Sequence, residues 1–139
     1  FAGATILVAG PNFGSGSSRE HAVWALEDAG FHVVIAPSFA DIFRNNCFKV
    51  GLLPVELPQE SVRALMDAVL DDPGTEITVD LDALRVSATA VHESFEIDPY
   101  TRWRLLEGLD DVDLTLRHAA AIDAYERARP ARLPSVPRP

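Results

Sequence analysis

The sequence predicts one α/β domain with a parallel β-α-β core, an additional β-hairpin and a helical C-terminus. Two continuous apolar runs, residues 4–9 and 31–36, flank a helical pattern, as expected for strands that are buried on both faces. Alternating apolar residues follow in the segment 77–87, and helical periodicity returns in the segment 100–127. Together these three patterns are typical of a mixed α/β architecture.

The N-terminal third is predicted to form the β-α-β unit. Residues 4–9 are expected to be an interior strand, because the residues of both alternating faces are apolar. Residues 18–29 are expected to form a helix, with one apolar face and Gly30 as its stop signal. Residues 31–36 are expected to be the second strand. Because strand, helix and strand fit within about thirty residues, the two strands should be parallel.

A second helix, a strand and a third helix are predicted next. Ser38 is expected to cap a helix that extends to about residue 48, before Gly51. A short strand is expected at residues 52–57. The segment 59–70 predicts an amphipathic helix, whose apolar stripe consists of Val62, Leu65, Met66, Val69 and Leu70.

The middle of the chain has the pattern of antiparallel strands. Residues 72–74 form a turn triplet of Asp, Pro and Gly. The alternation in residues 77–81 and the segment 84–87 then predict a β-hairpin. Residues 91–97 are expected to add a further strand.

The C-terminal part is predicted to be helical and then irregular. Helices are expected at residues 100–108 and 111–127, the second capped by Asp110. No internal repeat or linker divides the sequence, so the domain is expected to span residues 1–129. Residues 130–139 are rich in proline and without periodicity, and they are expected to be a disordered tail.

Composition limits the possible partners. The 139-residue chain is 47% hydrophobic and has a formal charge of −9, so nucleic acid and membrane partners are not expected. No apolar run approaches the ~20 residues that span a bilayer. The single cysteine, Cys47, cannot form an internal disulfide or a cysteine-based metal site, which favours a reducing cytoplasm. The chain begins at Phe1 almost within a strand, so an upstream segment is expected to be missing.

The glycine-rich stretch from residue 10 to residue 22 is the candidate site. It lacks the third glycine of a dinucleotide fingerprint, the lysine of a P-loop and the G-x-S-x-G of a hydrolase. It does leave a parallel strand and enter a helix N-terminus, where backbone N–H groups attract anions. We therefore expect the backbone at Gly14 and Gly16 to face an anion. The guanidinium of Arg19 is suited to a carboxylate or a phosphate.

A structural explanation of the same residues stands beside this one. Ser17 and Glu20 have the spacing of a capping box, in which Ser17 would be the N-cap of the helix. The local pattern favours neither explanation over the other. His21 and Cys47 are interpreted as structural rather than catalytic, and the four histidines lack the spacing of metal ligands.

Three segments carry a family resemblance. The motif GPNFGSGSSREHA, residues 10–22, resembles the signature of the aconitase swivel domain and, within it, of the small subunits of 3-isopropylmalate dehydratase. The segment APSFADIFRNNCFKVGLLPV, residues 36–55, resembles the second block of that family. The segment WRLLEGLDDVDLTLRHAAAIDAYE, residues 103–126, resembles the C-terminal block of the bacterial leucine-pathway small subunits. The family normally has several tens of residues before the first strand, so this chain resembles an N-terminally shortened form.

The resemblance implies a swivel-type β/β/α domain of a two-chain hydro-lyase that interconverts 2-isopropylmalate and 3-isopropylmalate in leucine biosynthesis. By residue, it implies that Ser17 is the base and that Arg19 and Ser18 bind the substrate. The substrate would be a small dicarboxylate hydroxy acid. The resemblance implies no metal ligand on this chain and a 4Fe-4S cluster on a large-subunit partner. Two alternatives stay open: homoaconitase or another aconitase-family small subunit, and a non-catalytic anion- or nucleotide-binding module in which Ser17 is only a cap.

Overall fold

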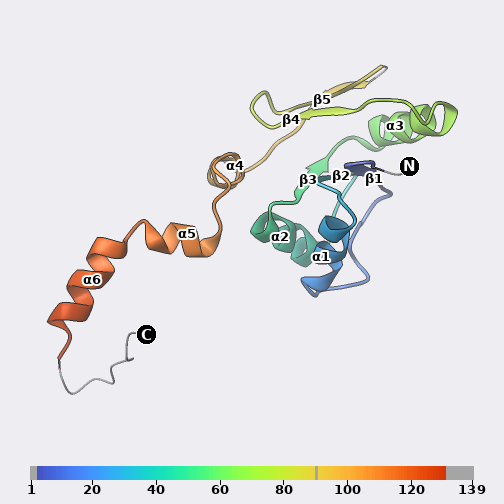
Figure 1. The fold of residues 1–139 in the computed structure, drawn as a ribbon. Coiled ribbons are helices and arrows are strands. Elements are labelled where there is room, and N and C mark those ends of the chain that lie inside the picture. Colours follow the sequence, from blue (N-terminus) through green and yellow to red (C-terminus); the bar gives the residue numbers. More distant parts are fainter. Residues whose placement is uncertain (1–2, 90, 131–139) are drawn as a thin grey trace. The chain divides into compact units, whose positions relative to one another are not determined.

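The computed structural model describes residues 3–89 and 91–130. The chain forms two compact units, Phe1–Gly108 and Leu109–Pro139, which are described separately below (Figure 1). The predicted α/β class, with a parallel core and helical C-terminus, is confirmed. The domain bounds predicted from the sequence stay a prediction, and the expected tail beyond residue 130 lies outside the described residues.

The first unit is built on a three-stranded parallel sheet. Its strands are β1 (Ile6–Val8), β2 (Val33–Ala36) and β3 (Leu53–Glu56), in the order β1-β2-β3. In register, Leu7 lies beside Val34, which lies beside Pro54. All three strands were predicted, and the parallel pairing of the first two is confirmed.

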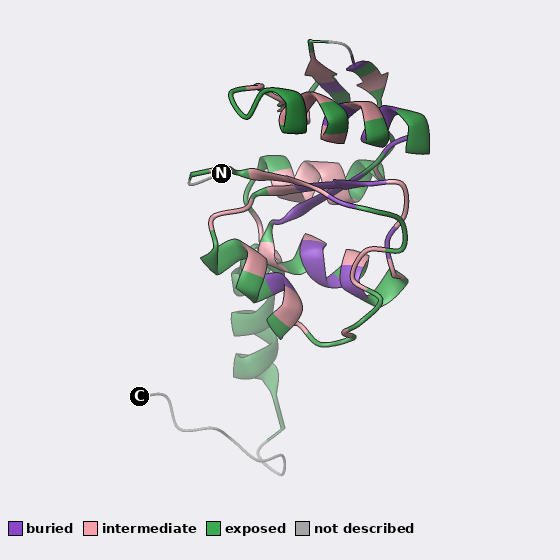
Figure 2. Cartoon of the chain, turned by 90° about the vertical axis from the view of Figure 1, so that its right-hand side faces the viewer, coloured by how far each residue is buried: buried purple, intermediate pink, exposed green. Residues whose placement is uncertain are grey.

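Helices α1 (His21–Asp28) and α2 (Asp41–Val50) cover one face of this sheet. Val34 and Ala36 point toward this layer and form a core with Val23 of α1 and with Phe43 and Cys47 of α2. In Figure 2 the buried residues lie in the strands and on the inner side of the helices. The alternation of apolar residues along β2 thus directs every second side chain into this core.

The opposite face is covered by α3 (Gln59–Asp71) and by a second, antiparallel sheet. That sheet contains β4 (Thr78–Asp80), β5 (Arg85–Ala88) and β6 (Val91–Ser94), in the order β4-β5-β6. It confirms the predicted hairpin and further strand. A second core joins the two sheets, and it consists of Ile35, Leu53, Val55, Leu57, Val62, Leu65, Val86, Val91 and Phe95.

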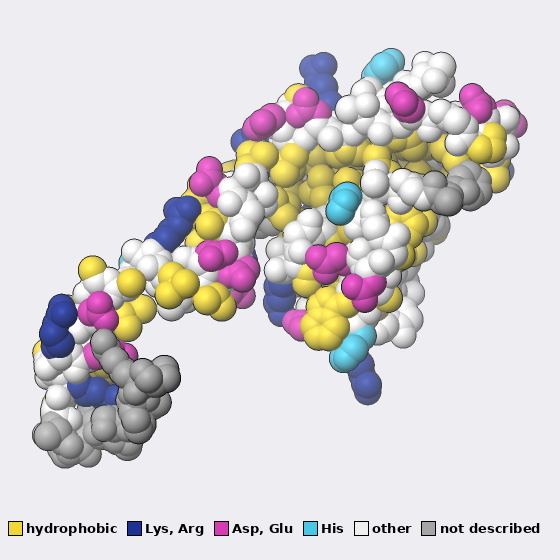
Figure 3. All heavy atoms as spheres, in the orientation of Figure 1, with side chains coloured by type: hydrophobic (Ala, Val, Ile, Leu, Met, Phe, Trp, Pro, Cys, Tyr) yellow, Lys and Arg dark blue, Asp and Glu magenta, His cyan; other side chains and the backbone are white. Residues whose placement is uncertain are grey.

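The second core is not closed on every side. In Figure 3 hydrophobic side chains are visible in a band between the layer of α1 and α2 and the layer of α3 and the antiparallel sheet. Strand β1 pairs only with β2 within the described residues, and its three residues are half-buried. The strand predicted to be interior is therefore an edge strand of the described sheet. Leu70, predicted on the apolar stripe of α3, is 73% exposed.

The first unit ends with α4 (Pro99–Leu106). Asp98 caps this helix and accepts hydrogen bonds from the backbone N–H of Thr101 at 2.9 Å and from its hydroxyl at 3.1 Å. Arg102 of α4 reaches the turn between β4 and β5, where its Nε donates to the carbonyl of Leu81 at 2.9 Å. The helix is thereby tied to the antiparallel sheet.

The second unit contains α5 (Asp111–Leu116) and α6 (Ala119–Ala128). The sequence predicted one helix here, but the structure has a break at residues 117–118. The Thr115 hydroxyl donates to the carbonyl of Asp111 at 2.9 Å, a contact that often bends helices. The predicted cap is confirmed, because Asp110 and Asp113 form a reciprocal capping box. Neither helix has a buried residue among those described, and each helix of the described chain is too short or too polar to span a bilayer.

Candidate functional site

The candidate site is the loop of residues 10–20, which leaves the carboxyl end of β1 and enters α1. Open α/β sheets bind ligands at the edge where the carboxyl ends of their parallel strands lie. The connection between β2 and α2 begins at the same edge, because the two strands are parallel neighbours. Both connections therefore take part in shaping the site.

Hydrogen bonds join the site loop to the connection after β2. The backbone N–H of Asn12 donates to Ser38 Oγ at 2.9 Å, and the N–H of Phe13 donates to the Ser38 carbonyl at 3.0 Å. The N–H of Ala40 returns a bond to the Phe13 carbonyl at 2.9 Å. The prediction that Ser38 caps a helix is therefore wrong: Ala40 is the N-cap of α2, and no side chain caps it.

Gly14 is held by the aromatic side chains beneath the loop. Its φ is +82°, a left-handed conformation, and a Cβ at this position would lie 2.2 Å from Cγ of Phe43. The Phe13 ring also packs edge-on against Phe43, with centroids 5.3 Å apart. Both backbone and packing thus require glycine at position 14. Gly16 differs, because a Cβ there would meet nothing within 4 Å.

Within residues 12–19, the backbone amide of Asn12 and four further amides donate to groups of the chain, whereas three amides have no such bond among the described residues. The N–H groups of Phe13, Ser15, Ser17 and Arg19 donate to Ser38 O, Asn12 O, Gly14 O and Ser17 Oγ. Within the described residues, those of Gly14, Gly16 and Ser18 make no hydrogen bond to the protein. Free backbone N–H groups ahead of a helix N-terminus attract anions. Gly14 and Gly16, at which the sequence predicts that the backbone faces an anion, are thus among the residues with an unused N–H, and the binding of an anion there stays a prediction.

The three predicted side chains lie together at the end of this loop. Ser17 is half-buried, whereas Ser18 and Arg19 are exposed. Ser17 Oγ accepts the N–H of Arg19 at 3.3 Å, as in a serine turn. The predicted capping box is not formed: the N-cap of α1 is Glu20, and no side chain caps the helix. The carboxylate of Glu20 instead lies 3.3 Å from Nζ of Lys49.

The described residues are poorly arranged to bind a metal ion. No group of three or more His, Cys, Asp or Glu side chains is placed there to hold one. Cys47 is fully buried, and burial raises the pKa of its thiol to about 12. The thiol therefore stays protonated at neutral pH, although thiolate is the form that binds metals and attacks electrophiles.

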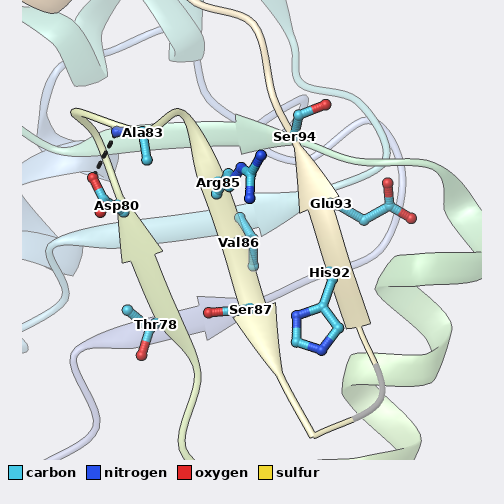
Figure 4. Close-up of a pocket in the computed structure, with 9 residues that line it drawn as sticks. All are labelled: Thr78, Asp80, Ala83, Arg85, Val86, Ser87, His92, Glu93 and Ser94. Carbon is cyan, nitrogen blue, oxygen red and sulfur yellow. Dashed lines mark hydrogen bonds between the residues drawn. The ribbon is translucent and has the colours of Figure 1, made fainter.

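Another depression lies on the outer face of the antiparallel sheet, away from the predicted site residues. It is lined by polar side chains of all three strands, among them Asp80, Arg85 and His92 (Figure 4). Asp80 also accepts the N–H of Ala83 at 2.7 Å within the β4–β5 turn. A polar outer face is ordinary for an antiparallel sheet that covers a core on its other side.

The sequence interpretation missed the residues that hold the loop, Asn12 and Ser38. Asn12 has a φ of +54°, and asparagine is several times more common than most residues in this conformation. An asparagine in a glycine-rich loop was thus a usable signal. The signal for Ser38 was weaker: it follows the neighbouring parallel strand and therefore lies at the same edge of the sheet as the loop.

Comparison with known proteins gives a consistent result. Family models match three segments: the aconitase C-terminal domain at residues 2–60, LeuD_N at residues 63–99, and the C-terminal domain of the small subunits of 3-isopropylmalate dehydratase at residues 111–134. The chain is 64% identical to a 3-isopropylmalate dehydratase small subunit of Acidothermus cellulolyticus, over 98% of this chain and 69% of that protein. It is 60% identical to that of Rubrobacter xylanophilus, over 96% and 69%. A crystal structure of 3-isopropylmalate dehydratase from Methanocaldococcus jannaschii is similar, with a TM-score of 0.62 and 32% identity over 87% of this chain and 68% of that one.

Proposed function

The chain belongs to the 3-isopropylmalate dehydratase small-subunit family, and from this we propose that it contributes one side of an active site that interconverts 2-isopropylmalate and 3-isopropylmalate. The reaction is a dehydration followed by a rehydration, in leucine biosynthesis. The other side of the site belongs to the large subunit. The observation that carries this proposal is the arrangement of free backbone N–H groups, Ser17 and Arg19 on one loop.

Each of the three side chains has a role in the proposal. Arg19 binds a substrate carboxylate, because its guanidinium presents paired donors to both oxygens. Ser18 adds a hydroxyl contact beside it. Ser17 takes the carbon-bound proton in the dehydration and returns it in the rehydration. The unused N–H groups of Gly14, Gly16 and Ser18 stabilise the negative charge that grows on the substrate as the proton leaves.

The energetics explain why a partner is needed. Lowering the pKa of a hydroxyl from that of water to about 7 requires roughly 12 kcal/mol, at about 1.4 kcal/mol per pKa unit. A helix terminus supplies at most about 2 kcal/mol. Arg19 is exposed, so water screens its charge. The large subunit must therefore cover the loop and exclude water before Ser17 becomes a base.

The iron–sulfur cluster of the family is assigned to the large subunit. The described residues of this chain do not fit such a group, because Cys47 is buried and protonated and no three His, Cys, Asp or Glu side chains among those residues are placed to hold a metal. The chemistry assigned to this chain is therefore substrate binding and proton transfer.

The proposal is tested by reconstituting the chain with its cluster-loaded large subunit and measuring the isomerisation of 2-isopropylmalate. Neither subunit should turn over substrate alone. Ser17→Ala should abolish turnover, and it should lower the free energy of unfolding by less than about 1 kcal/mol because Ser17 caps no helix. Arg19→Lys keeps the charge but loses the paired donors, so it should chiefly weaken substrate binding.

Two outcomes would point elsewhere. Full activity of Ser17→Ala would remove Ser17 from the mechanism and favour a non-catalytic anion-binding loop. Faster turnover of homocitrate-derived or citrate-type substrates than of 2-isopropylmalate would favour a homoaconitase or another member of the superfamily. Ser18→Ala is a useful comparison, because it should reduce the rate less than Ser17→Ala.

A further inference from the structure

The start of the site loop depends on one residue of another connection. Ser38 makes two contacts there: its hydroxyl accepts the N–H of Asn12 at 2.9 Å, and its carbonyl accepts the N–H of Phe13 at 3.0 Å. Asn12 is 26 residues away in sequence and has a φ of +54°. Ser38 caps no helix, since Ala40 occupies the N-cap of α2 without a side-chain bond. Its hydroxyl is therefore directed at the loop.

We propose that Ser38 is a positioning residue, which holds Asn12 in its left-handed conformation and so sets the direction in which the loop carries Ser17 and Arg19. The effect of Ser38 on the reaction rests on the proposed function. Its effect on the loop conformation rests only on the hydrogen bonds that Ser38 makes to Asn12 and Phe13.

The strengths of the loop contacts support this role. The bonds at the start of the loop, between residues 12–13 and Ser38, are 2.9–3.0 Å long. The bonds further along are longer, 3.4 Å from Ser15 to Asn12 and 3.3 Å from Ser17 to Gly14. Hydrogen bonds of this length restrain the backbone only weakly. The orientation of Ser17 is therefore determined mainly by its fixed start, at Asn12 and Gly14.

The conformation of Asn12 makes the hydroxyl of Ser38 necessary. A side chain with a Cβ is disfavoured at positive φ, even though asparagine tolerates it best. The main-chain bonds of Phe13 do not depend on the Ser38 side chain, so removal of the hydroxyl leaves them in place. Asn12 alone is then released, and the chain after it can turn in a different direction.

Ser38→Ala tests the proposal, with Ser38→Thr as the conservative variant that keeps the hydroxyl. Ser94→Ala, an exposed serine on the outer face of β6, is the matched control. The readouts are amide hydrogen exchange of the isolated chain, and kcat and KM of the reconstituted complex. Ser38→Ala should accelerate exchange of the hydrogen-bonded amides in the segment 10–19, above all that of Asn12, about tenfold and leave exchange in α2 unchanged. It should lower kcat about tenfold or more with a smaller change in KM. Ser38→Thr should restore both.

Three results would overturn the proposal. One is wild-type exchange in the segment 10–19 of Ser38→Ala. Another is an equal acceleration in α2, since the hydroxyl would then stabilise the fold in general. The third is failure of Ser38→Thr to restore exchange. An inactive wild-type complex would instead contradict the proposed function, and the exchange measurement on the chain alone would still decide the role of Ser38.

Discussion

Gly14 and Gly16 lie on either side of Ser15 in the sequence but have different surroundings in the structure. Gly14 combines a positive φ with a Cβ position that overlaps the Phe43 side chain, whereas Gly16 has neither restriction. Glycine is thus needed at position 14 because only a residue without a Cβ lets the loop backbone pack directly against Phe43. At position 16 the sterics leave room for a side chain, so any need for glycine there would come from a ligand near the backbone.

Alanine substitutions should separate the two glycines. Gly14→Ala should lower the free energy of unfolding by about 2–4 kcal/mol, from the strained backbone and from overpacking against Phe43. Gly16→Ala should change it by about 0.5 kcal/mol or less. Denaturant unfolding measures both. Equal stability of the two variants would mean that neither the positive φ of Gly14 nor its contact with Phe43 requires glycine.

At the scale of elements, periodicity predicted most strands and helices, whereas their ends depended on contacts that a local pattern does not contain. The strand at 91–97 and the helix at 59–70 were found with small shifts. The first helix begins at His21 rather than at residue 18, because the backbone of residues 15–19 turns on itself within the site loop. The residues of the site were predictable as a motif. Their support by Ser38 was not, since it comes from a segment distant in sequence.

Helix α4 gives a prediction about pH. Hydrogen bonds from the backbone and then the hydroxyl of Thr101 hold the pKa of Asp98 below its ordinary value of 3.8. A carboxyl whose pKa is lowered by folding stabilises the fold above its unfolded pKa, and this contribution is lost as pH falls through the folded pKa. Asp98→Ala should therefore lower the Tm at pH 7, and the Tm values of the variant and the wild type should converge in acid.

Thermal unfolding monitored by circular dichroism across the acidic range measures this difference. Glu96→Ala removes an exposed carboxylate two residues away and serves as the control. A Tm difference for Asp98→Ala that is constant down to the lowest pH would show that the charge of Asp98 adds nothing to its role as a cap.

At the scale of the whole molecule, the free edge of β1 opposes the high net charge. The 139-residue chain carries a formal charge of −9, which keeps molecules apart. However, salt screens this repulsion beyond about 8 Å at physiological ionic strength. Unpaired edge strands with apolar residues pair with other chains, and β1 has such an edge, within the described residues, beside the apolar band between the layers.

The chain alone should therefore associate, and more strongly in physiological salt than in low salt. Thr5→Lys places a charge beside the β1 edge at an exposed position and should reduce association. Gln59→Lys makes the same change of charge at the start of α3 and should reduce it less. Light scattering measures all three proteins. A monomer of the wild type in both salt conditions would contradict the prediction.

The alternating direction of the side chains along β2 has a consequence for how the sequence can evolve. Val34 and Ala36 pack into one core, and Ile35 packs into the other. The two cores therefore share strand β2 but draw on different side chains of it. The family-model matches change at the start of α3, where the chain passes from one face to the other. The face that bears the site loop corresponds to the part shared with aconitases. The layer of α3 and β4–β6 packs on the other face, so we expect its substitutions to affect the loop only through the shared sheet and to be tolerated more readily than substitutions of Val23, Phe43 or Cys47.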